Sequence, residues 1–326
     1  MGTIPLVHTE VTVMKEIAPT YYPRFACIAD RCRHSCCIGW EIDIDGDALT
    51  RYGATEGELG QRLKENIRRT ETPHFVLTES QRCPFLNSHG LCDLIIGLGE
   101  ESLCQICADH PRFRNAFSDR TEIGLGLCCE AAGRLILSET APAELMVLTD
   151  DGEDEGLWEE EWALLTLRGE VFALLQDRHK SIPERISGML ELCGAVLPEW
   201  SMAEWAEQYL ALERLDEEWT QRLTALRNAE PAKPPLPLKD TVWEQLLVYF
   251  VYRHFPAALE DEDIPSKAGF AAVSFALIHA LAVVQYQETA SFTLDDLVEI
   301  ARMYSAEVEY SDENLEILFD ILKNEQ

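Results

Sequence analysis

Cysteines give this sequence its most distinctive chemistry. Ten of the eleven lie between Cys27 and Cys129, and four of these fall within one short stretch: Cys27, Cys32, Cys36 and Cys37. Thiols gathered this densely can form disulfides, bind zinc or hold an iron–sulfur cluster. The choice among these three decides what class of protein this is.

Disulfides are the least favoured of the three. They persist in oxidising compartments, and the first residues lack the charged start and long apolar core of a secretory leader. A chain of 326 residues also buries enough apolar surface to fold without covalent staples. We therefore expect reduced thiols, a metal site and a cytoplasmic location.

The spacing of the thiols does not separate zinc from iron–sulfur ligation. Zinc sites usually pair thiolates as C-x2–4-C, and Cys27-x4-Cys32-x3-Cys36-Cys37 departs from that pattern. In a cluster each thiolate binds its own iron, which tolerates looser spacing. Further candidate ligands are Cys83, Cys92, Cys104 and Cys107, whereas His34 and His110 read as surface or supporting residues and Cys193 as a small core residue.

Charge and motifs exclude several other functions. The net charge of −31 argues against nucleic-acid binding, because phosphates would be repelled. Most of that charge lies in residues 141–326, which we interpret first as a solubility feature and second as a surface that attracts a basic partner. The sequence has no Walker A motif and no Gly-x-Ser-x-Gly elbow, and Gly124-Leu-Gly126 lacks the third glycine of a dinucleotide loop.

The first half of the chain predicts short mixed elements. Alternation from Trp40 to Asp45 predicts a strand, followed by a turn at Asp45-Gly46-Asp47. We further expect a helix over Glu58–Arg69, a hairpin over Arg112–Leu127 with a turn at Ser118–Arg120, and a short helix over Ala131–Ser138.

The second half predicts helices. An acidic run over Asp150–Gly156 marks the boundary, and Ser181 with Glu184 forms a capping box. One long amphipathic helix is expected over Ser201–Arg227, followed after a proline-rich crossing by helices at about 241–254, 266–288, 293–307 and 312–323. The apolar stretch Ala268–Val284 is short for a membrane span and predicts the central helix of a bundle, with His279 in the core.

The predicted fold class is therefore α+β and mainly helical. A small cysteine-rich mixed domain over residues 1–148 precedes an acidic all-α helical bundle over residues 149–326.

Several motifs resemble the flagellin lysine-N-methylase family. They include Tyr21-Tyr-Pro-Arg-Phe25, the cysteine block ending in Gly39-Trp40, Cys83-Pro-Phe-Leu86, Tyr252-Arg-His-Phe255 and Tyr304-Ser-x-Glu-Val-Glu309. The resemblance covers nearly the whole chain, although the cysteine block alone is shared with broader zinc- or iron-chelating domains. It implies methyl transfer from S-adenosylmethionine to lysine side chains of flagellin, dependent on a [4Fe–4S] cluster.

By that resemblance eight cysteines match the family's own: Cys27, Cys32, Cys36, Cys37, Cys83, Cys92, Cys107 and Cys128. Three features depart from the family pattern. Cys129 stands where we expect proline, Ile106 where threonine is common, and Cys104 is additional. These departures leave open which thiols bind the cluster.

Residues outside the cysteine set supply the remaining candidates. Tyr21, Tyr22 and Trp40 could form an aromatic wall around an ammonium or sulfonium cation. Arg112 could clamp a carboxylate of the donor. A lysine amine reacts only when neutral, so a base is needed, and the candidates are Asp43, Asp45 and Glu130.

The sequence also allows two other functions. One is a non-catalytic zinc- or iron-binding protein whose metal site is structural and whose acidic helical half binds a partner. The other is a redox or iron-handling protein that uses the surplus thiols. The partner that the methylase resemblance implies is flagellin or another basic, lysine-bearing protein. We expect no nucleic acid and no membrane as partners.

Overall fold

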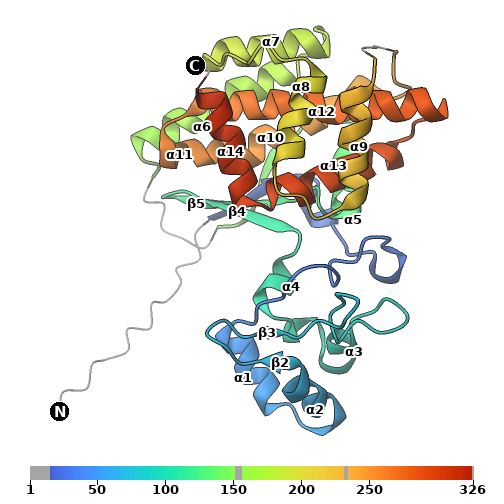
Figure 1. The fold of residues 1–326 in the computed structure, drawn as a ribbon. Helices are drawn as coiled ribbons and strands as arrows, with labels where there is room; N and C mark the ends of the chain where they lie inside the picture. The colour runs from blue at the N-terminus through green and yellow to red at the C-terminus, as the bar shows by residue number, and fades with distance from the viewer. Residues whose placement is uncertain (1–14, 151–155, 231–233, 325–326) are drawn as a thin grey trace.

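The computed structural model describes residues 15–150, 156–230 and 234–324. A large body of helices stands against a small sheet, and a smaller lobe hangs from the sheet side (Figure 1). The predicted class, α+β and mainly helical, is confirmed.

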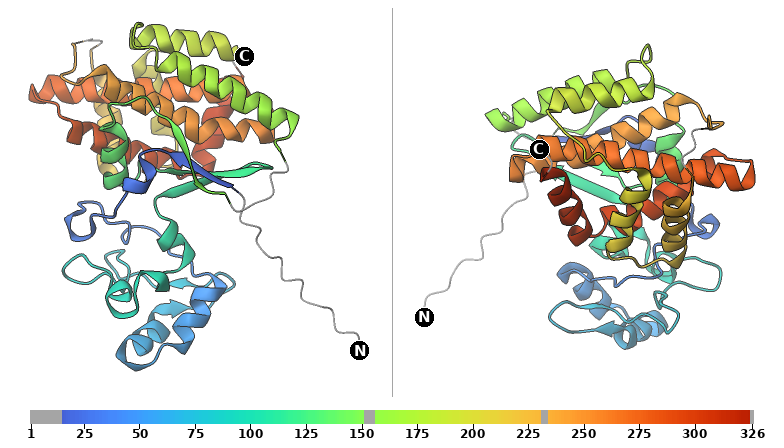
Figure 2. Two further views of the ribbon diagram at one scale, coloured as in Figure 1. Left: turned by 180° about the vertical axis from the view of Figure 1, so that it is seen from behind. Right: turned by 45° about the horizontal axis from the view of Figure 1, so that its top comes forward.

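The main sheet has four strands in the order β4-β5-β1-β6, namely β4 (Arg112–Ala116), β5 (Arg120–Leu125), β1 (Lys15–Pro19) and β6 (Leu145–Thr149). Strand β1 runs parallel to β5 and antiparallel to β6. The predicted hairpin is confirmed as β4–β5, with Phe117 N–H donating to Arg120 O across the polar turn. The sheet lies between the helices and the lobe in all views (Figure 2).

Helices of the large body follow the predicted periodicity closely. They are α5 (Glu130–Leu137), α6 (Glu159–Leu175), α7 (Ile182–Cys193), α8 (Met202–Ala211), α9 (Glu217–Asn228), α10 (Asp240–His254), η4 (Phe255–Ala257), α11 (Ala258–Asp261), α12 (Ile264–Thr289), α13 (Leu294–Tyr304), the π-helical turn η5 (Ser305–Glu309) and α14 (Asp312–Lys323). The predicted capping box at Ser181 is present, and it satisfies backbone donors at the start of α7.

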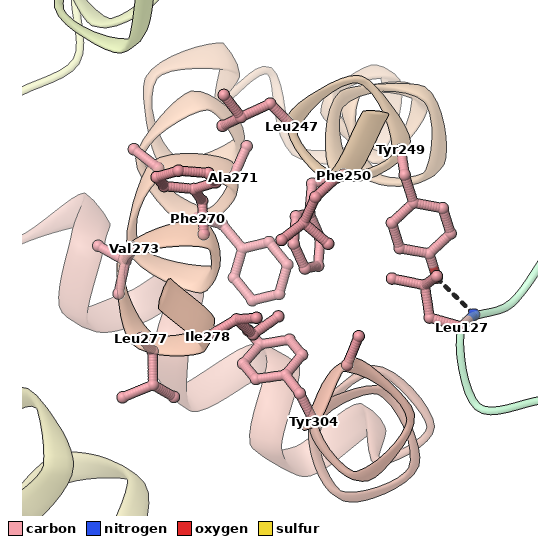
Figure 3. Packing of buried hydrophobic residues seen from close by; sticks show 14 of the residues in the cluster. Leu127, Leu247, Tyr249, Phe250, Phe270, Ala271, Val273, Leu277, Ile278 and Tyr304 are labelled. Atoms are coloured by element: carbon pink, nitrogen blue, oxygen red, sulfur yellow. Dashed lines mark hydrogen bonds between the residues drawn. The ribbon is translucent and has the colours of Figure 1, made fainter. Parts of the chain in front are cut away.

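Helix α12 is the centre of the body, as predicted. It packs against α10, α14, α7 and α13. It is long and apolar enough to cross a membrane by length and composition, but 72% of its most apolar window is buried inside the protein. Phe270 and Ile278 of α12 meet Phe250 and Tyr304 in the core (Figure 3), and His279 stacks on Phe275.

The smaller lobe has its own apolar core. It contains α1 (Gly46–Ala54), α2 (Gly57–Asn66), β2 (Ile67–Arg68), β3 (His74–Phe75), α3 (Asp93–Leu98), η3 (Glu100–Ser102) and α4 (Gln105–Asp109). Eleven buried residues between Ile42 and Cys104 form this core, and Phe75 and Phe85 pack edge to face at its centre. The loop that leads from the sheet into the lobe carries two short turns, η1 (Tyr22–Arg24) and η2 (Ala29–Arg31).

The strand predicted from Trp40 to Asp45 is wrong. Ile42 and Ile44 are buried as the alternation requires, but Asp43 makes only an isolated bridge with His74. The predicted turn at Asp45-Gly46-Asp47 is also wrong, because Asp45 caps α1 by accepting from Ala48 N–H at 2.8 Å. An aspartate immediately before a helix stabilises the helix N-terminus, and the same residue type is also common in turns. The sequence alone therefore did not distinguish the two.

The single helix predicted over Ser201–Arg227 is also wrong. The chain forms α8 and α9, separated by an extended link at 212–216. The carboxylate of Glu307 accepts the backbone N–H groups of Leu215 and Asp216 at 2.8 and 2.9 Å. The backbone donors of this break in the helix are thus satisfied by a side chain 91 residues away. Sequence periodicity cannot predict such a long-range contact.

The predicted domain boundary stays a prediction. Residues 151–155 of the acidic run lie outside the described residues. The larger core cluster includes Tyr21, Leu125 and Ile136 together with the C-terminal helices. The sheet strands and α5 therefore pack on the helical body, whereas the lobe core draws on residues 42–104.

Candidate functional site

All eleven cysteines are free thiols. Ten of them lie between Cys27 and Cys129, and nine of these ten fall into two sets according to their neighbours. We call these the lobe thiols (Cys37, Cys83, Cys92, Cys104 and Cys107) and the junction thiols (Cys27, Cys32, Cys36 and Cys129). Cys193 lies apart in the core of the helical body, as predicted.

The lobe thiols are held by short backbone contacts. Cys83 N–H donates to Cys37 O at 2.8 Å, which brings two distant segments together. Leu86 forms a bridge with Cys92, and this bridge folds the loop after Cys83 back on itself. Cys104 is the N-cap residue of α4. Cys107 lies one turn later, and its backbone N–H donates to the backbone oxygen of Cys104.

The lobe thiols perturb one another's pKa values. Burial, followed by the nearby thiols of Cys37 and Cys92, raises the pKa of Cys83 to about 12. A thiol–thiol hydrogen bond raises the pKa of Cys107 and lowers that of Cys104. Cys37 and Cys83 also lie close enough to Cys107 to raise its pKa further.

The junction thiols are positioned by contacts to the helical body. Arg33 N–H donates to Glu130 at 3.2 Å, and Glu130 directly follows Cys129 at the start of α5. Burial raises the pKa of Cys129, and the neighbouring thiols of Cys32 and Cys27 raise it further. Cys27 is exposed and Cys32 half-buried, so this set faces solvent more than the lobe thiols do.

Cys36 and Cys37 join the two sets. Their thiols are hydrogen-bonded, which lowers the pKa of Cys37 to about 7 and raises that of Cys36. Cys36 has Cys27 and Cys129 as further electrostatic neighbours, whereas Cys37 neighbours Cys83 and Cys92.

Cys128, one of the predicted metal ligands, points elsewhere. Its thiol is hydrogen-bonded to Tyr310, and burial raises its pKa to about 12. A side chain at Gly126 would collide with the Tyr310 hydroxyl and approach Arg253. Glycine at 126 therefore reflects close packing at the end of β5, and it does not form a nucleotide-binding loop.

The distances between the thiols bear on the choice of metal. A tetrahedral zinc site with zinc–sulfur bonds of ~2.3 Å needs sulfur atoms about 3.8 Å apart. Within the described ranges, the one group of three or more ligand atoms lying within 4.8 Å of one another is Glu41, Asp43 and His74. No three thiols of the described residues lie within 4.8 Å of one another, so the thiols as placed do not form a tetrahedral zinc site.

Of the predicted aromatic wall, only Tyr22 lies beside Arg112. The Arg112 Nε–H donates to the Tyr22 hydroxyl at 2.9 Å. The guanidinium carbon lies 5.9 Å from the centre of the Tyr22 ring and 5.4 Å from the centre of the Phe25 ring. Tyr21 is buried in the core of the helical body. Trp40 packs on the lobe core and donates its indole N–H to Cys36 O at 2.6 Å.

The three base candidates lie in different surroundings. Backbone hydrogen bonds from Ala48 and Gln105 outweigh the effect of burial and lower the pKa of Asp45, which is a structural cap. Asp43 is exposed beside Glu41 and His74. Glu130 is 5% exposed, next to the junction thiols, and is the candidate that the structure places at the thiol site.

Sequence reasoning missed a buried ionic network centred on Glu309. Its carboxylate accepts from the Tyr249 hydroxyl at 2.9 Å and lies 2.6 Å from His254 Nε2 and 3.4 Å from Arg253 Nε. The Arg253 guanidinium also covers the rings of Phe113 and Tyr310. The sequence signal was present, since both partners lie in motifs quoted above for the family resemblance.

Residues 203–326 match the sequence model of the FliB lysine N-methylase C-terminal domain. The C-terminal part of this chain is thus similar to the C-terminal domain of lysine N-methylases. A Lysine-N-methylase of Salmonella typhimurium is 27% identical over 143 residues, which cover 39% of this chain and 34% of the relative. One of Salmonella choleraesuis is 26% identical with the same coverage.

A third relative is the Flagellar biosynthetic protein FliU of Salmonella muenchen. It is 24% identical over 136 residues, which cover 39% of this chain and 80% of that protein. The matched part thus spans about a third of the length of the two lysine-N-methylases. No solved structure matches this chain.

The matched segment, residues 203–326, contacts the cysteine-bearing segments directly. Glu299 of α13 lies 2.8 Å from His34 Nε2, in the loop between Cys32 and Cys36. Tyr310 contacts the Cys128 thiol at the end of the sheet. The segment that matches the family model therefore contacts both the loop between Cys32 and Cys36 and the Cys128 thiol.

Proposed function

We propose that this protein is a lysine N-methyltransferase that moves a methyl group from S-adenosylmethionine to lysine side chains of a protein substrate, with flagellin as the substrate and a [4Fe–4S] cluster as cofactor. Relatives named Lysine-N-methylase support the chemistry. The name of the FliU relative refers to flagellar biosynthesis and supports flagellin.

The observation that carries the proposal is the contact between the matched domain and the thiol-bearing loop. Glu299 accepts from His34 at 2.8 Å and also lies 3.8 Å from the Arg33 guanidinium. Arg33 in turn bonds to Glu130, beside Cys129. One ionic chain thus links the lysine-N-methylase domain, the loop and the start of α5 at a solvent-facing site.

Glu130 is the residue that we assign to the reacting amine. A lysine ammonium with an ordinary pKa of about 10.4 must lose its proton before its nitrogen can attack. The carboxylate of Glu130 can accept that proton, and its contact with Arg33 fixes its orientation. The new N–C bond then replaces the sulfonium S–C bond, and S-adenosylhomocysteine leaves neutral at sulfur.

Arg112 is the residue that we assign to the donor's carboxylate. Its Nε and Nη1 are held by Tyr22 and by Ala108 O, and the fork is oriented by the two aromatic rings below it. A guanidinium held in one orientation recognises a carboxylate with both direction and charge. Because Arg112 already covers the Tyr22 ring, Tyr22 acts through Arg112 in this assignment.

The donor set fits a cluster. Soft thiolates suit iron–sulfur ligation, and ligands for it would come from Cys27, Cys32, Cys36 and Cys129 at the solvent-facing site. A cluster held by only three of these four thiolates would have one iron without a protein ligand, and that iron would supply a Lewis-acidic position for the donor.

Methyl transfer tests this function directly. The protein, purified without oxygen, is incubated with methyl-labelled S-adenosylmethionine and flagellin, and labelled lysines are located by mass spectrometry. We expect label in flagellin, loss of at least tenfold in rate for Glu130→Gln, and no change for Cys193→Ala. Label on an unrelated lysine-rich protein at the same rate would reject flagellin as the specific substrate. Absence of label on any protein would favour the non-catalytic metal-binding alternative.

A further inference from the structure

Three side chains of the lobe have ligand chemistry that the proposed function does not use. The ligand atoms of Glu41, Asp43 and His74 all lie within 4.8 Å of one another. Two carboxylates and an imidazole are oxygen and nitrogen donors, which suit divalent ions such as Mn²⁺, whereas thiolates select softer metals. The group is therefore chemically distinct from the thiol site.

Backbone pairing places the three side chains on one face of the lobe. The segment before α1 runs beside β3, with an antiparallel bridge between Asp43 and His74. Two backbone hydrogen bonds flank this bridge, and they join Ile42 and Ile44 to the chain around β3 at 3.1 and 2.8 Å. Ile42 and Ile44 lie in the lobe core. Because side chains alternate along an extended segment, Glu41 and Asp43 are directed to the opposite face.

The orientation of His74 leaves one ring nitrogen available for a ligand. Its Nδ1 lies 3.0 Å from the backbone oxygen of Thr72. That oxygen can only accept a hydrogen bond, so Nδ1 carries the proton, and a neutral ring then has its lone pair on Nε2. Nε2 lies 3.4 Å from a carboxylate oxygen of Glu41. Histidines that bind metals are commonly oriented in this way, by a hydrogen bond from the other nitrogen to a backbone oxygen.

Three acceptor atoms therefore converge without a cation from the chain. In the part of the chain that the structure describes, neither carboxylate forms an ion pair with a lysine or an arginine. The Glu41 side chain is 62% exposed and that of His74 is 16% exposed, so the group opens to solvent through its carboxylates. Both residues also line an open pocket of about 240 Å³, which has room for water molecules.

We propose that Glu41, Asp43 and His74 bind one divalent metal ion, of the class of Mn²⁺. Metal–ligand bonds of about 2.1 Å place ligand atoms about 3–3.5 Å apart, and the exposed carboxylates can rotate to reach that spacing. Three protein ligands leave the remaining positions to water from the pocket. The ion links the segment that follows the cysteine block to β3. This site does not depend on the proposed function.

Manganese binding tests the proposal. The full chain, purified without oxygen, is titrated with Mn²⁺ at pH 8, and the free ion is followed by electron paramagnetic resonance. Thiolates prefer softer ions, so Mn²⁺ reports on the oxygen and nitrogen ligands. We expect one Mn²⁺ per chain, and at least tenfold weaker affinity in each of Glu41→Gln, Asp43→Asn and His74→Gln. Glu58→Gln, at an exposed position of α2, is the matched control and should bind as the parent protein does.

A second measurement identifies the ligands. Pulsed electron paramagnetic resonance of the bound ion should show coupling to an imidazole nitrogen, and His74→Gln should remove that coupling. Absence of Mn²⁺ binding would overturn the proposal. So would equal affinity in the parent and all three variants, because the acidic surface alone would then account for binding, or bound Mn²⁺ without nitrogen coupling. Methyl transfer is not measured, so these outcomes are separate from failure of the proposed function.

Discussion

Glu309 places a negative charge inside the helical body, with its side chain fully buried. Arg253, His254 and Tyr249 all contact this carboxylate. Glu309 is the last residue of the π-helical turn η5. The extra backbone residue of a π-helical turn changes the direction of the side chains that follow it, here that of Glu309. The charge is tolerated in the interior because three polar partners replace its lost hydration.

Replacing Glu309 by Ala should destabilise the protein by about 3–5 kcal/mol, because it leaves the Arg253 charge buried without its partner. The free energy of unfolding in urea measures this effect. Glu316→Ala, at an exposed position of α14, is the matched control and should change stability by less than about 0.5 kcal/mol. A small effect at Glu309 would show that the network contributes little.

Glu309 also makes stability depend on pH. Burial alone would raise its pKa, but the Arg253 charge and the His254 hydrogen bond outweigh burial and lower the pKa to about 2. A lowered pKa in the folded state contributes stability above the ordinary value of about 4.3. That contribution is lost as the pH falls toward 2. Thermal unfolding measured between pH 6 and pH 2 should therefore show a shallower acid loss in Glu309→Gln than in the parent protein.

At the scale of elements, the link between α8 and α9 depends on η5. Glu307 accepts two backbone N–H groups of this link, and Asn314 bonds to both the N–H and the C=O of Glu213. The link is extended because these distant groups satisfy its backbone, so a continuous helix has no advantage there.

Glu307→Ala should therefore cost about 1–3 kcal/mol, since it leaves two partly buried donors without acceptors. Hydrogen exchange should speed up at Leu215 and Asp216 more than in the centre of α12. Glu207→Ala, exposed on α8, serves as the control. Uniform exchange across the helical body would contradict a local role for Glu307.

At the scale of the whole molecule, the hydrophobic core of the lobe is much smaller than that of the helical body. The body has a continuous core around α12, whereas the lobe has a small one beside five thiols. We expect chelation under reducing conditions to unfold the lobe first, because removing metal removes folding free energy from a small unit.

Limited proteolysis tests this prediction. After metal removal, cleavage should concentrate within residues 42–107, while most helical circular dichroism persists. Cleavage within α10 or α12 at the same rate would show that the two parts unfold together. Untreated protein, kept without oxygen, provides the reference.

Periodicity and local turn residues were sufficient to predict the helical character of the second half, the hairpin and the central apolar helix. The density of cysteines between Cys27 and Cys129 also indicated a metal-binding site. Only the tertiary structure divided those thiols between two cores, turned Cys128 toward Tyr310 and brought Glu309 to Arg253. These outcomes depend on contacts between residues far apart in the chain, and local residue pattern carries no information about which distant backbone groups will meet.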